Sequence, residues 1–228
     1  MSVAFGDLAE RLEREGFHLD GEPLAALAGY LDLLLRWNKA MNLVGTRTWQ
    51  DTVSRLIVDS LHLGRFLETM PLPEAPLCWD PGAGAGLPGI PLRMIWQRGT
   101  YWMIEAREKR ALFLASVLAR HPLPETHVFR GRLEAFCEQQ ADGPPADLVV
   151  SRAFMPWRQL LPLMAPHLAP GGFVVFLLNE DTDLVPARIG EAAPGWEWHA
   201  CLPYTAASES RVLHAVRRLS STAGLETA

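Results

Sequence analysis

The sequence has few cysteines, no long uncharged apolar run and no excess of positive charge. Its three cysteines, Cys78, Cys137 and Cys201, lie far apart, a spacing that suits neither a disulfide framework nor a zinc site, and we expect no bound metal. No stretch of about 18 uncharged apolar residues occurs, so no membrane span is expected. The formal net charge of −5 gives no sign of nucleic-acid binding, although a local basic face is sufficient for such binding.

The N-terminal segment, MSVAFGDLAERLEREG, is charged and amphipathic and lacks the apolar region of a signal peptide. Together with the isolated cysteines, this predicts a cytoplasmic protein. Hydrophobic residues make up 49% of the 228 residues, which is enough for a sizeable core. We therefore expect one globular unit with an appendage. We also expect a monomer.

The first third of the chain has the periodicity of helices. A stripe at three- and four-residue spacing consists of Leu24, Leu27, Leu31, Leu34 and Leu35. A further helix is expected over residues 49–67, and the three prolines of ETMPLPEAP (68–76) mark a boundary. We therefore divide the chain into an N-terminal helical extension (1–75) packed on a core (76–228).

After this boundary, short apolar runs alternate with segments of helical length such as 107–120. The runs lie at 77–80, 100–104, 126–130, 147–151 and 173–178. Strands that alternate with helices predict a mainly parallel α/β sheet. The last two runs, 196–203 and 211–217, have no clear helix between them, so we expect an antiparallel pair at one edge.

The segment CWDPGAGAGLPGIP (78–91) follows the first expected strand and contains Gly82, Gly84, Gly86 and Gly89. In an open parallel sheet, such a turn lies beyond the carboxyl end of a strand and lets the backbone approach a ligand closely. A tight turn that needs glycine only for positive φ is the alternative. The last three glycines also match G-x-G-x-x-G, which alone is weak evidence for a dinucleotide.

Carboxylates at successive strand ends favour S-adenosylmethionine over a dinucleotide. Asp80 stands at the entrance of the glycine turn, where it would oppose an anionic pyrophosphate but suit a cofactor with a sulfonium and an ammonium. Glu105 ends the next expected strand, where a carboxylate can accept hydrogen bonds from ribose hydroxyls, although a solvated helix cap is the alternative. Glu134 follows the third strand and Asp147 begins the fourth.

Several longer motifs resemble those of the bacterial 16S ribosomal RNA guanine-N7 methyltransferases, a family also called glucose-inhibited division protein B. They are RWNKAMNLVGTR (36–47), RLIVDSLHL (55–63), DPGAGAGLPGIPL (80–92), EAREKRALFL (105–114), GRLEAF (131–136), SRAF (151–154) and LAPGG (168–172). The resemblance implies a Rossmann-like class I methyltransferase sheet and S-adenosylmethionine as cofactor. It also implies methyl transfer to N7 of one guanine of 16S rRNA, at position 527 in standard rRNA numbering.

The resemblance further implies which residues hold the cofactor. Direct contacts would come from Gly82, Leu87, Leu133, Glu134 and Arg152. The same pocket would be lined by Asp80, Gly84, Gly86, Glu105 and Ala106. The chain departs from the family pattern at Leu56, where His is usual, at Glu105, where Asp is usual, and at Asn179-Glu180, where Lys-Gly is common.

Guanine N7 carries an in-plane lone pair and no proton at neutral pH, so its methylation needs no general base. The enzyme has to hold N7 in line with the methyl–sulfur bond, and such positioning contributes about 7–11 kcal/mol. Ser151 and Arg152, at the end of the fourth expected strand, are placed for the substrate side of the methyl group. An ion pair of Arg152 with Glu134 or Asp80 is the alternative.

Two sets of residues are candidates for RNA contact, because RNA binding requires phosphate contacts. One set follows the second strand and consists of Arg107, Lys109 and Arg110. The other belongs to the extension and consists of Asn38, Asn42 and Arg55. Helix capping or a solvated charged face is the alternative for these residues. The expected partner is 16S rRNA or a small-subunit assembly intermediate.

Two other functions are compatible with the same cofactor motifs. One is an S-adenosylmethionine-dependent methyltransferase of a small molecule or a protein. Only the motifs of the extension, by their resemblance to the rRNA methyltransferases, distinguish an RNA enzyme from it. The other is a module that binds S-adenosylmethionine or RNA without catalysis.

Overall fold

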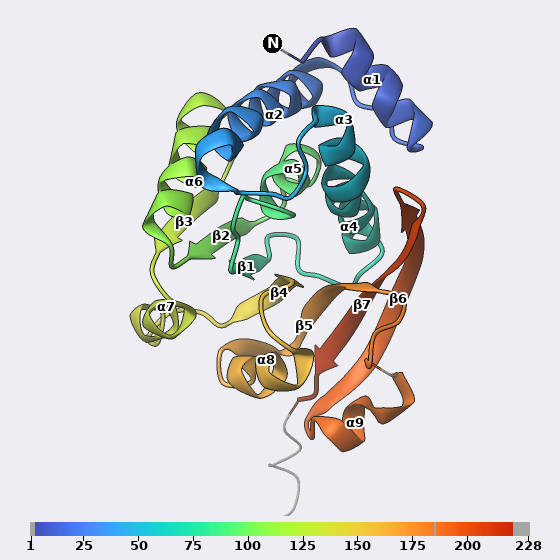
Figure 1. The fold of residues 1–228 in the computed structure, drawn as a ribbon. Coiled ribbons are helices and arrows are strands. Elements are labelled where there is room, and N and C mark those ends of the chain that lie inside the picture. The colour runs from blue at the N-terminus through green and yellow to red at the C-terminus, as the bar shows by residue number, and fades with distance from the viewer. Residues whose placement is uncertain (1–2, 185, 221–228) are drawn as a thin grey trace, which may run out of the picture.

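The computed structural model describes residues 3–184 and 186–220. A seven-stranded sheet forms the centre of this part of the chain (Figure 1). Its strands are β1 (Leu77–Pro81), β2 (Thr100–Glu105), β3 (Thr126–Arg130), β4 (Ala146–Arg152), β5 (Leu168–Asn179), β6 (Trp196–Ala206) and β7 (Glu209–Arg218). They lie in the order β3-β2-β1-β4-β5-β7-β6. Strands β1 to β5 pair in parallel, and β7 pairs antiparallel with β5 and β6. The predicted mostly parallel sheet with an antiparallel edge pair is confirmed.

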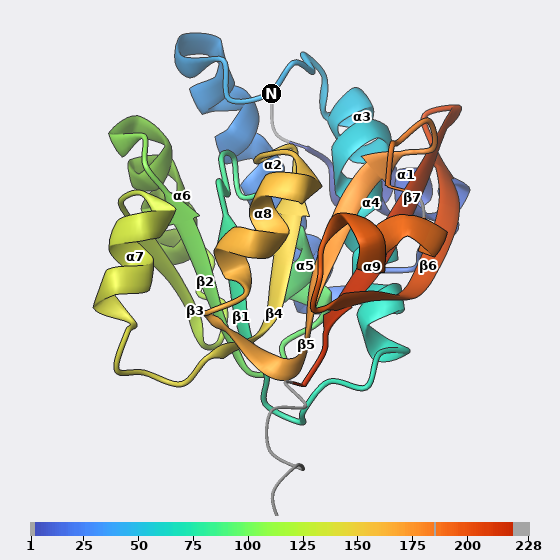
Figure 2. The ribbon, with the colours of Figure 1, turned by 90° about the horizontal axis from the view of Figure 1, so that it is seen from below.

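Helices cover both faces of the sheet (Figures 1 and 2). One face carries α1 (Phe5–Arg14), α2 (Gly21–Met41), α3 (Trp49–Thr52), α4 (Val58–Glu68), α5 (Gly89–Ile95) and α6 (Glu108–Arg120). The other face carries α7 (Leu133–Gln139), α8 (Trp157–Met164) and α9 (Ile189–Ala192). Along β4, Leu148 and Val150 pack on the first face and Val149 on the second. Burial on both faces explains why the strands read as continuous apolar runs.

The N-terminal helices share one apolar cluster with the first face of the sheet. Four leucines of the predicted stripe in α2 are buried, and Leu35 is half-buried. The helix predicted over 49–67 consists of α3, a π-helical turn (Val53–Ile57) and α4. The division of the chain at residue 75 stays a prediction, and residues 221–228 of the expected core lie outside the described residues.

One fully buried guanidinium, that of Arg93 in α5, holds the segment between α5 and β3 together. It donates hydrogen bonds of 2.7–3.3 Å to the Thr126 hydroxyl and to the carbonyls of Trp96, Gln97, Arg98, Gly99 and Pro124. Because these carbonyls belong to the connection from α5 to β2 and to the residues before β3, Arg93 joins two neighbouring strand starts.

The chain reverses direction across the sheet between β1 and β4. From β1 it runs outward through β2 to β3, and it then returns to place β4 on the other side of β1. In open α/β sheets, ligands bind beyond the carboxyl ends of the strands at such a switch point. The glycine turn follows β1 and therefore lies at this position.

Candidate active site

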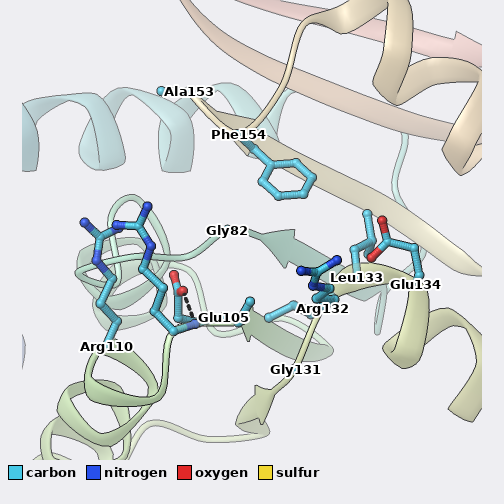
Figure 3. A pocket seen from close by; sticks show the side chains of 12 residues that line it. Gly82, Glu105, Arg110, Gly131, Arg132, Leu133, Glu134, Ala153 and Phe154 are labelled. Carbon is cyan, nitrogen blue, oxygen red and sulfur yellow. Dashed lines mark hydrogen bonds between the residues drawn. The ribbon is translucent and has the colours of Figure 1, made fainter.

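A cavity of about 360 Å³ opens at the carboxyl ends of β1 to β4 (Figure 3). Gly82 follows β1, residues 104–107 span the end of β2, and Arg110 lies in α6. Residues 131–134 span the start of α7, and Ala153 and Phe154 follow β4. Its volume lies within the range of about 300–1,000 Å³ that is usual for small-molecule sites. The strand ends that the sequence singled out therefore meet around one cavity.

The glycine turn needs positive φ at three positions. Gly82, Gly84 and Gly86 have φ values of 72°, 60° and 79°, a region that residues with a Cβ rarely adopt. A Cβ on Gly82 would lie 2.4 Å from the Phe154 ring, and one on Gly86 would lie 2.4 Å from Ile90. A Cβ on Gly84 would meet no atom closer than 3.6 Å, so at Gly84 only the backbone conformation demands glycine.

Glu105 ties the glycine turn to the start of α6. Its carboxylate is buried and accepts hydrogen bonds from the backbone amides of Gly84 at 2.9 Å and Arg107 at 2.7 Å. An ionised carboxylate has about four lone-pair positions, so two acceptor positions are left for a ligand in the cavity that Glu105 lines. The alternative of a solvated helix cap is therefore excluded, because the Glu105 carboxylate is buried.

Five residues that the resemblance places around the cofactor do not line this cavity: Asp80, Gly84, Gly86, Leu87 and Arg152. All of them except the half-buried Arg152 are buried. The Asp80 carboxyl lies beneath the glycine turn, where it accepts a hydrogen bond from the Tyr101 hydroxyl at 3.1 Å. Burial raises the pKa of this carboxyl to about 7, and the hydrogen bond from Tyr101 and the charge of Arg152 oppose that rise. Asp80 therefore supports the glycine turn from the core side and does not face the cavity.

The lining of the cavity fits S-adenosylmethionine. Glu105 and Glu134 can accept from ribose hydroxyls and an ammonium, and the guanidiniums of Arg107, Arg110 and Arg132 can bind a carboxylate. Apolar contacts are available from Ile104, Leu133 and Phe154. S-adenosylmethionine carries ribose hydroxyls, an ammonium and a carboxylate. The arginines, which the sequence analysis did not assign to the cofactor, can therefore bind its carboxylate.

Arg152 reaches a carboxylate that the sequence analysis missed. Its Nη2 atom lies 2.9 Å from Oδ2 of Asp59, a residue of α4 whose side chain is 2% exposed. Asp59 also accepts hydrogen bonds from Arg211 of β7 at 2.7 Å and from the Tyr204 hydroxyl of β6 at 2.9 Å. The signal available in the sequence was a lone acid within the apolar segment RLIVDSLHL.

The alternative for Arg152, an ion pair with Glu134 or Asp80, is not what the structure shows, because its ion pair is with Asp59. Successive residues of a strand point to opposite faces. Leu148 and Val150 pack on the face covered by α4, so Arg152 points to the same face and meets Asp59. Ser151, by the same alternation, points to the other face and is buried.

The RNA-contact candidates lie in three places. Arg107, Lys109, Arg110 and Asn42 line a neighbouring cavity of about 470 Å³ at the end of α2, and Arg107 and Arg110 line the first cavity as well. Asn38 closes the loop after α2 by donating to the Thr46 carbonyl and accepting from the Val44 amide, both at 2.9 Å. Arg55 is exposed on the π-helical turn.

Gly84 provides a test of the turn. Gly84→Val is expected to fold but to bind S-adenosylmethionine at least about tenfold more weakly, because a β-branched residue resists φ near +60° and would displace the amide that Glu105 holds. Calorimetry of cofactor binding measures this effect. Gly86→Val is the contrasting variant and is expected to lose stability first, since its side chain would overlap Ile90 and Leu114. Unchanged affinity in folded Gly84→Val would contradict the role assigned to the turn.

Among the described helices, none is long and apolar enough to cross a membrane. Within residues 3–184 and 186–220, no group of three or more His, Cys, Asp or Glu side chains is arranged to hold a metal ion.

Comparison with known proteins identifies the family. Residues 24–184 match the model of the family described as rRNA small subunit methyltransferase G. A ribosomal RNA small subunit methyltransferase G from Nitratidesulfovibrio vulgaris (strain DP4) is 61% identical over 196 residues, 86% of each chain. One from Lawsonia intracellularis (strain PHE/MN1-00) is 46% identical over 205 residues, 90% of this chain and 91% of its own.

Solved structures with low sequence identity share the fold. The tRNA (m1A58) methyltransferase TrmI from Aquifex aeolicus has 17% identity and a TM-score of 0.51 over 72% of this chain and 69% of its own. An rRNA methylase from Streptococcus thermophilus has 13% identity and a TM-score of 0.50 over 70% of this chain and 95% of its own. The chain therefore belongs to the rRNA small subunit methyltransferase G family and is an S-adenosylmethionine-dependent methyltransferase.

Proposed function

We propose that the protein transfers the methyl group of S-adenosylmethionine to N7 of one guanine of 16S rRNA, the guanine at position 527 by family resemblance. The main support for an RNA substrate is the match of residues 24–184 to a family of small-subunit rRNA methyltransferases. The side chains that line the cavity support guanine N7 as the acceptor atom. The described residues that line the cavity include no histidine, lysine, cysteine or tyrosine, so the usual general bases other than a carboxylate are missing from it.

When bound, the cofactor supplies a methyl group on a positively charged sulfur. The protein's own residues position the reactants. Glu105, Glu134 and the arginines of the cavity hold the cofactor, and Phe154, which lies against Gly82 at the end of β4, limits the room for water. Arg152, at the end of β4 next to this cavity, is the residue proposed to orient the guanine. Ser151, which the sequence also predicted for this role, is buried on the opposite face of the strand.

Asp59 explains how a cation can serve beside a guanine that becomes positively charged. An unpaired guanidinium would oppose the charge that develops on the methylated base. The carboxylate of Asp59, at 2.9 Å, compensates the charge of Arg152, and a compensated guanidinium can still donate to guanine O6. We therefore assign Arg152 to orientation of the base and Asp59 to positioning of Arg152.

The direct test uses 16S rRNA and small subunits that lack the modification. Incubation with methyl-labelled S-adenosylmethionine, followed by mass spectrometry of nucleosides, is expected to yield labelled 7-methylguanosine and no other labelled nucleoside. A label on a small molecule or on a ribosomal protein would favour the alternative methyltransferase. Cofactor binding without any transfer to RNA or protein would favour a non-catalytic module.

The pH profile of the chemical step follows from the acceptor atom. Since N7 loses no proton, the single-turnover rate at saturating cofactor and RNA is expected to be nearly flat between about pH 6.5 and 8.5, where a base such as histidine would titrate. Arg152→Ala is expected to lower the rate without adding a pH dependence. A roughly tenfold rise per pH unit, with chemistry limiting, would contradict a base-free mechanism.

Asp80 predicts a pH dependence of stability instead. Its pKa is raised from 3.8 to about 7 in the folded protein, so the folded state retains a proton that the unfolded state releases, and stability is lost as pH rises through this window. Relative to Asp80→Asn, the free energy of unfolding is expected to fall by roughly 2–3 kcal/mol between about pH 5 and pH 8, at 1.36 kcal/mol per unit. Urea denaturation of both proteins measures the difference. An equal pH dependence in the two proteins would contradict this assignment.

A further inference from the structure

We propose that a second cavity binds a phosphodiester of the RNA substrate beside the target nucleotide, an inference that rests on the proposed function. This basic cavity has a volume of about 490 Å³ and is lined by Gly45, Thr46, Arg47, Asp51, Arg55, Leu56 and Arg211. It is distinct from the cofactor cavity, with which it shares no lining residue.

Three segments that are far apart in the sequence build the basic cavity. Arg47 comes from the loop between α2 and α3, Arg55 from the π-helical turn and Arg211 from β7. The Arg55 carbonyl accepts a hydrogen bond of 2.7 Å from Nη1 of Arg211, which fastens the π-helical turn to β7. Turns of this kind occur frequently at functional sites.

The guanidiniums of the cavity differ in how they are held. Arg47 is exposed and makes no hydrogen bond or ion pair with the rest of the described chain. Arg55 has an exposed side chain whose nearest carboxylate oxygen, on Glu209, is 3.9 Å away. Arg211 is fixed, with only 12% of its side chain exposed, by Asp59 and by Glu209 at 2.8 Å. Two exposed guanidiniums and one fixed guanidinium thus surround the cavity.

The charge balance favours a singly charged anion. Three guanidiniums face the cavity, against the carboxylate of Asp51 in its lining and that of Glu209 at its edge. The carboxylate of Asp59 lies below the surface and is shared with Arg152. A phosphodiester carries one negative charge, and its oxygens match the planar donor fork of arginine.

The position of the basic cavity favours the RNA backbone over a free anion. Arg211 and Arg152 bind the same carboxylate, at 2.7 and 2.9 Å, so one side chain separates the cavity from the residue proposed to orient the guanine. An enzyme that modifies a base has to take the base out of its stack, and contacts to the flanking phosphates fix the register while it does so. In a chain with a net charge of −5, such contacts need a local basic site.

The test compares three charge-matched variants, Arg47→Gln, Arg55→Gln and Arg188→Gln. Arg188 is exposed and lines neither the basic cavity nor the cofactor cavity, so its variant controls for net charge. Equilibrium binding of small-subunit RNA is measured at about 50 to 200 mM salt, and methyl transfer to the same RNA is measured separately. Arg47→Gln and Arg55→Gln are each expected to weaken RNA binding about tenfold and to reduce the salt slope by about 0.7–0.9, with unchanged cofactor affinity.

A second arm places a methylphosphonate on the phosphodiester next to the target guanosine. The wild-type protein is expected to bind this RNA about tenfold more weakly than the unmodified RNA, and Arg47→Gln is expected to show little further loss, because the partner charge is already gone. Equal effects of all three variants on affinity and slope would overturn the proposal. Because binding needs no turnover, wild-type protein that binds RNA without methylating it would refute the proposed function and leave the phosphate site testable.

Discussion

Replacing Asp59 with alanine is expected to lower the free energy of unfolding by about 3–5 kcal/mol, which is the usual cost of removing one partner of a buried ion pair. The carboxylate receives Arg152, Arg211 and the Tyr204 hydroxyl at 2.7–2.9 Å, and its side chain is 2% exposed. Without it, two guanidiniums would stay close together with no shared counter-charge. Urea denaturation at pH 7.5 measures the loss.

Two milder variants separate the charge from the packing. Asp59→Asn keeps the shape of the side chain and one acceptor oxygen, so enough of this variant is expected to fold for kinetic measurements. We expect its single-turnover methyl transfer to fall about 100-fold, while its cofactor affinity stays within about twofold of the wild type. Tyr204→Phe removes only the hydroxyl that donates to Asp59 and is expected to cost about 1 kcal/mol of stability with little change in rate. A full rate in Asp59→Asn, or equal stability losses in Asp59→Ala and Tyr204→Phe, would contradict the positioning role.

Arg93→Met is expected to prevent folding. The guanidinium of Arg93 is fully buried and serves five carbonyls and one hydroxyl, none of which a methionine can satisfy. The Thr126 hydroxyl and the Trp96 carbonyl are buried, and each would cost about 1–3 kcal/mol when left without a donor. Four partly buried carbonyls add to this loss, which together takes up much of the stability of about 5–15 kcal/mol that is usual for a protein domain. Circular dichroism and the yield of soluble protein measure the outcome.

Arg98 offers a matched control in the same region. It also donates to backbone carbonyls, those of Leu72, Pro73 and Glu74, but its side chain is 31% exposed. Water can replace these bonds, so Arg98→Met is expected to cost no more than about 1–1.5 kcal/mol. A stable, folded Arg93→Met with a loss similar to that of Arg98→Met would show that the buried guanidinium is dispensable.

The sequence was sufficient for the elements whose signal is local. Strands buried on both faces appear as uninterrupted apolar runs, such as FVVFLL in β5, and the leucine stripe of α2 has helical spacing. The glycines of the turn after β1 were recognisable because positive φ restricts the choice of residue. The antiparallel edge pair followed from two strands without a helix between them.

The contacts of the site depend on tertiary structure and were harder to predict. Arg152 and Asp59 meet because β4 ends beside α4, and Arg211 joins them through the folding of the β6–β7 hairpin across 152 positions of sequence. Strand alternation could have excluded Glu134 as the partner of Arg152. The burial of Asp80 below the turn could not be read from its place at the end of β1, since inward and outward positions there look alike in sequence.

The most direct test of guanine N7 as the acceptor is methylation of 16S RNA that carries 7-deazaguanosine at the modified position. In this analogue a C–H replaces N7, while O6, N1, N2 and the ribose are unchanged. We expect single-turnover methyl transfer to this RNA to fall at least about 100-fold with unchanged RNA binding, while RNA with 2′-deoxyguanosine at that position keeps its rate. Methyl transfer to the 7-deaza RNA at the normal rate would contradict the account and place the acceptor at another atom.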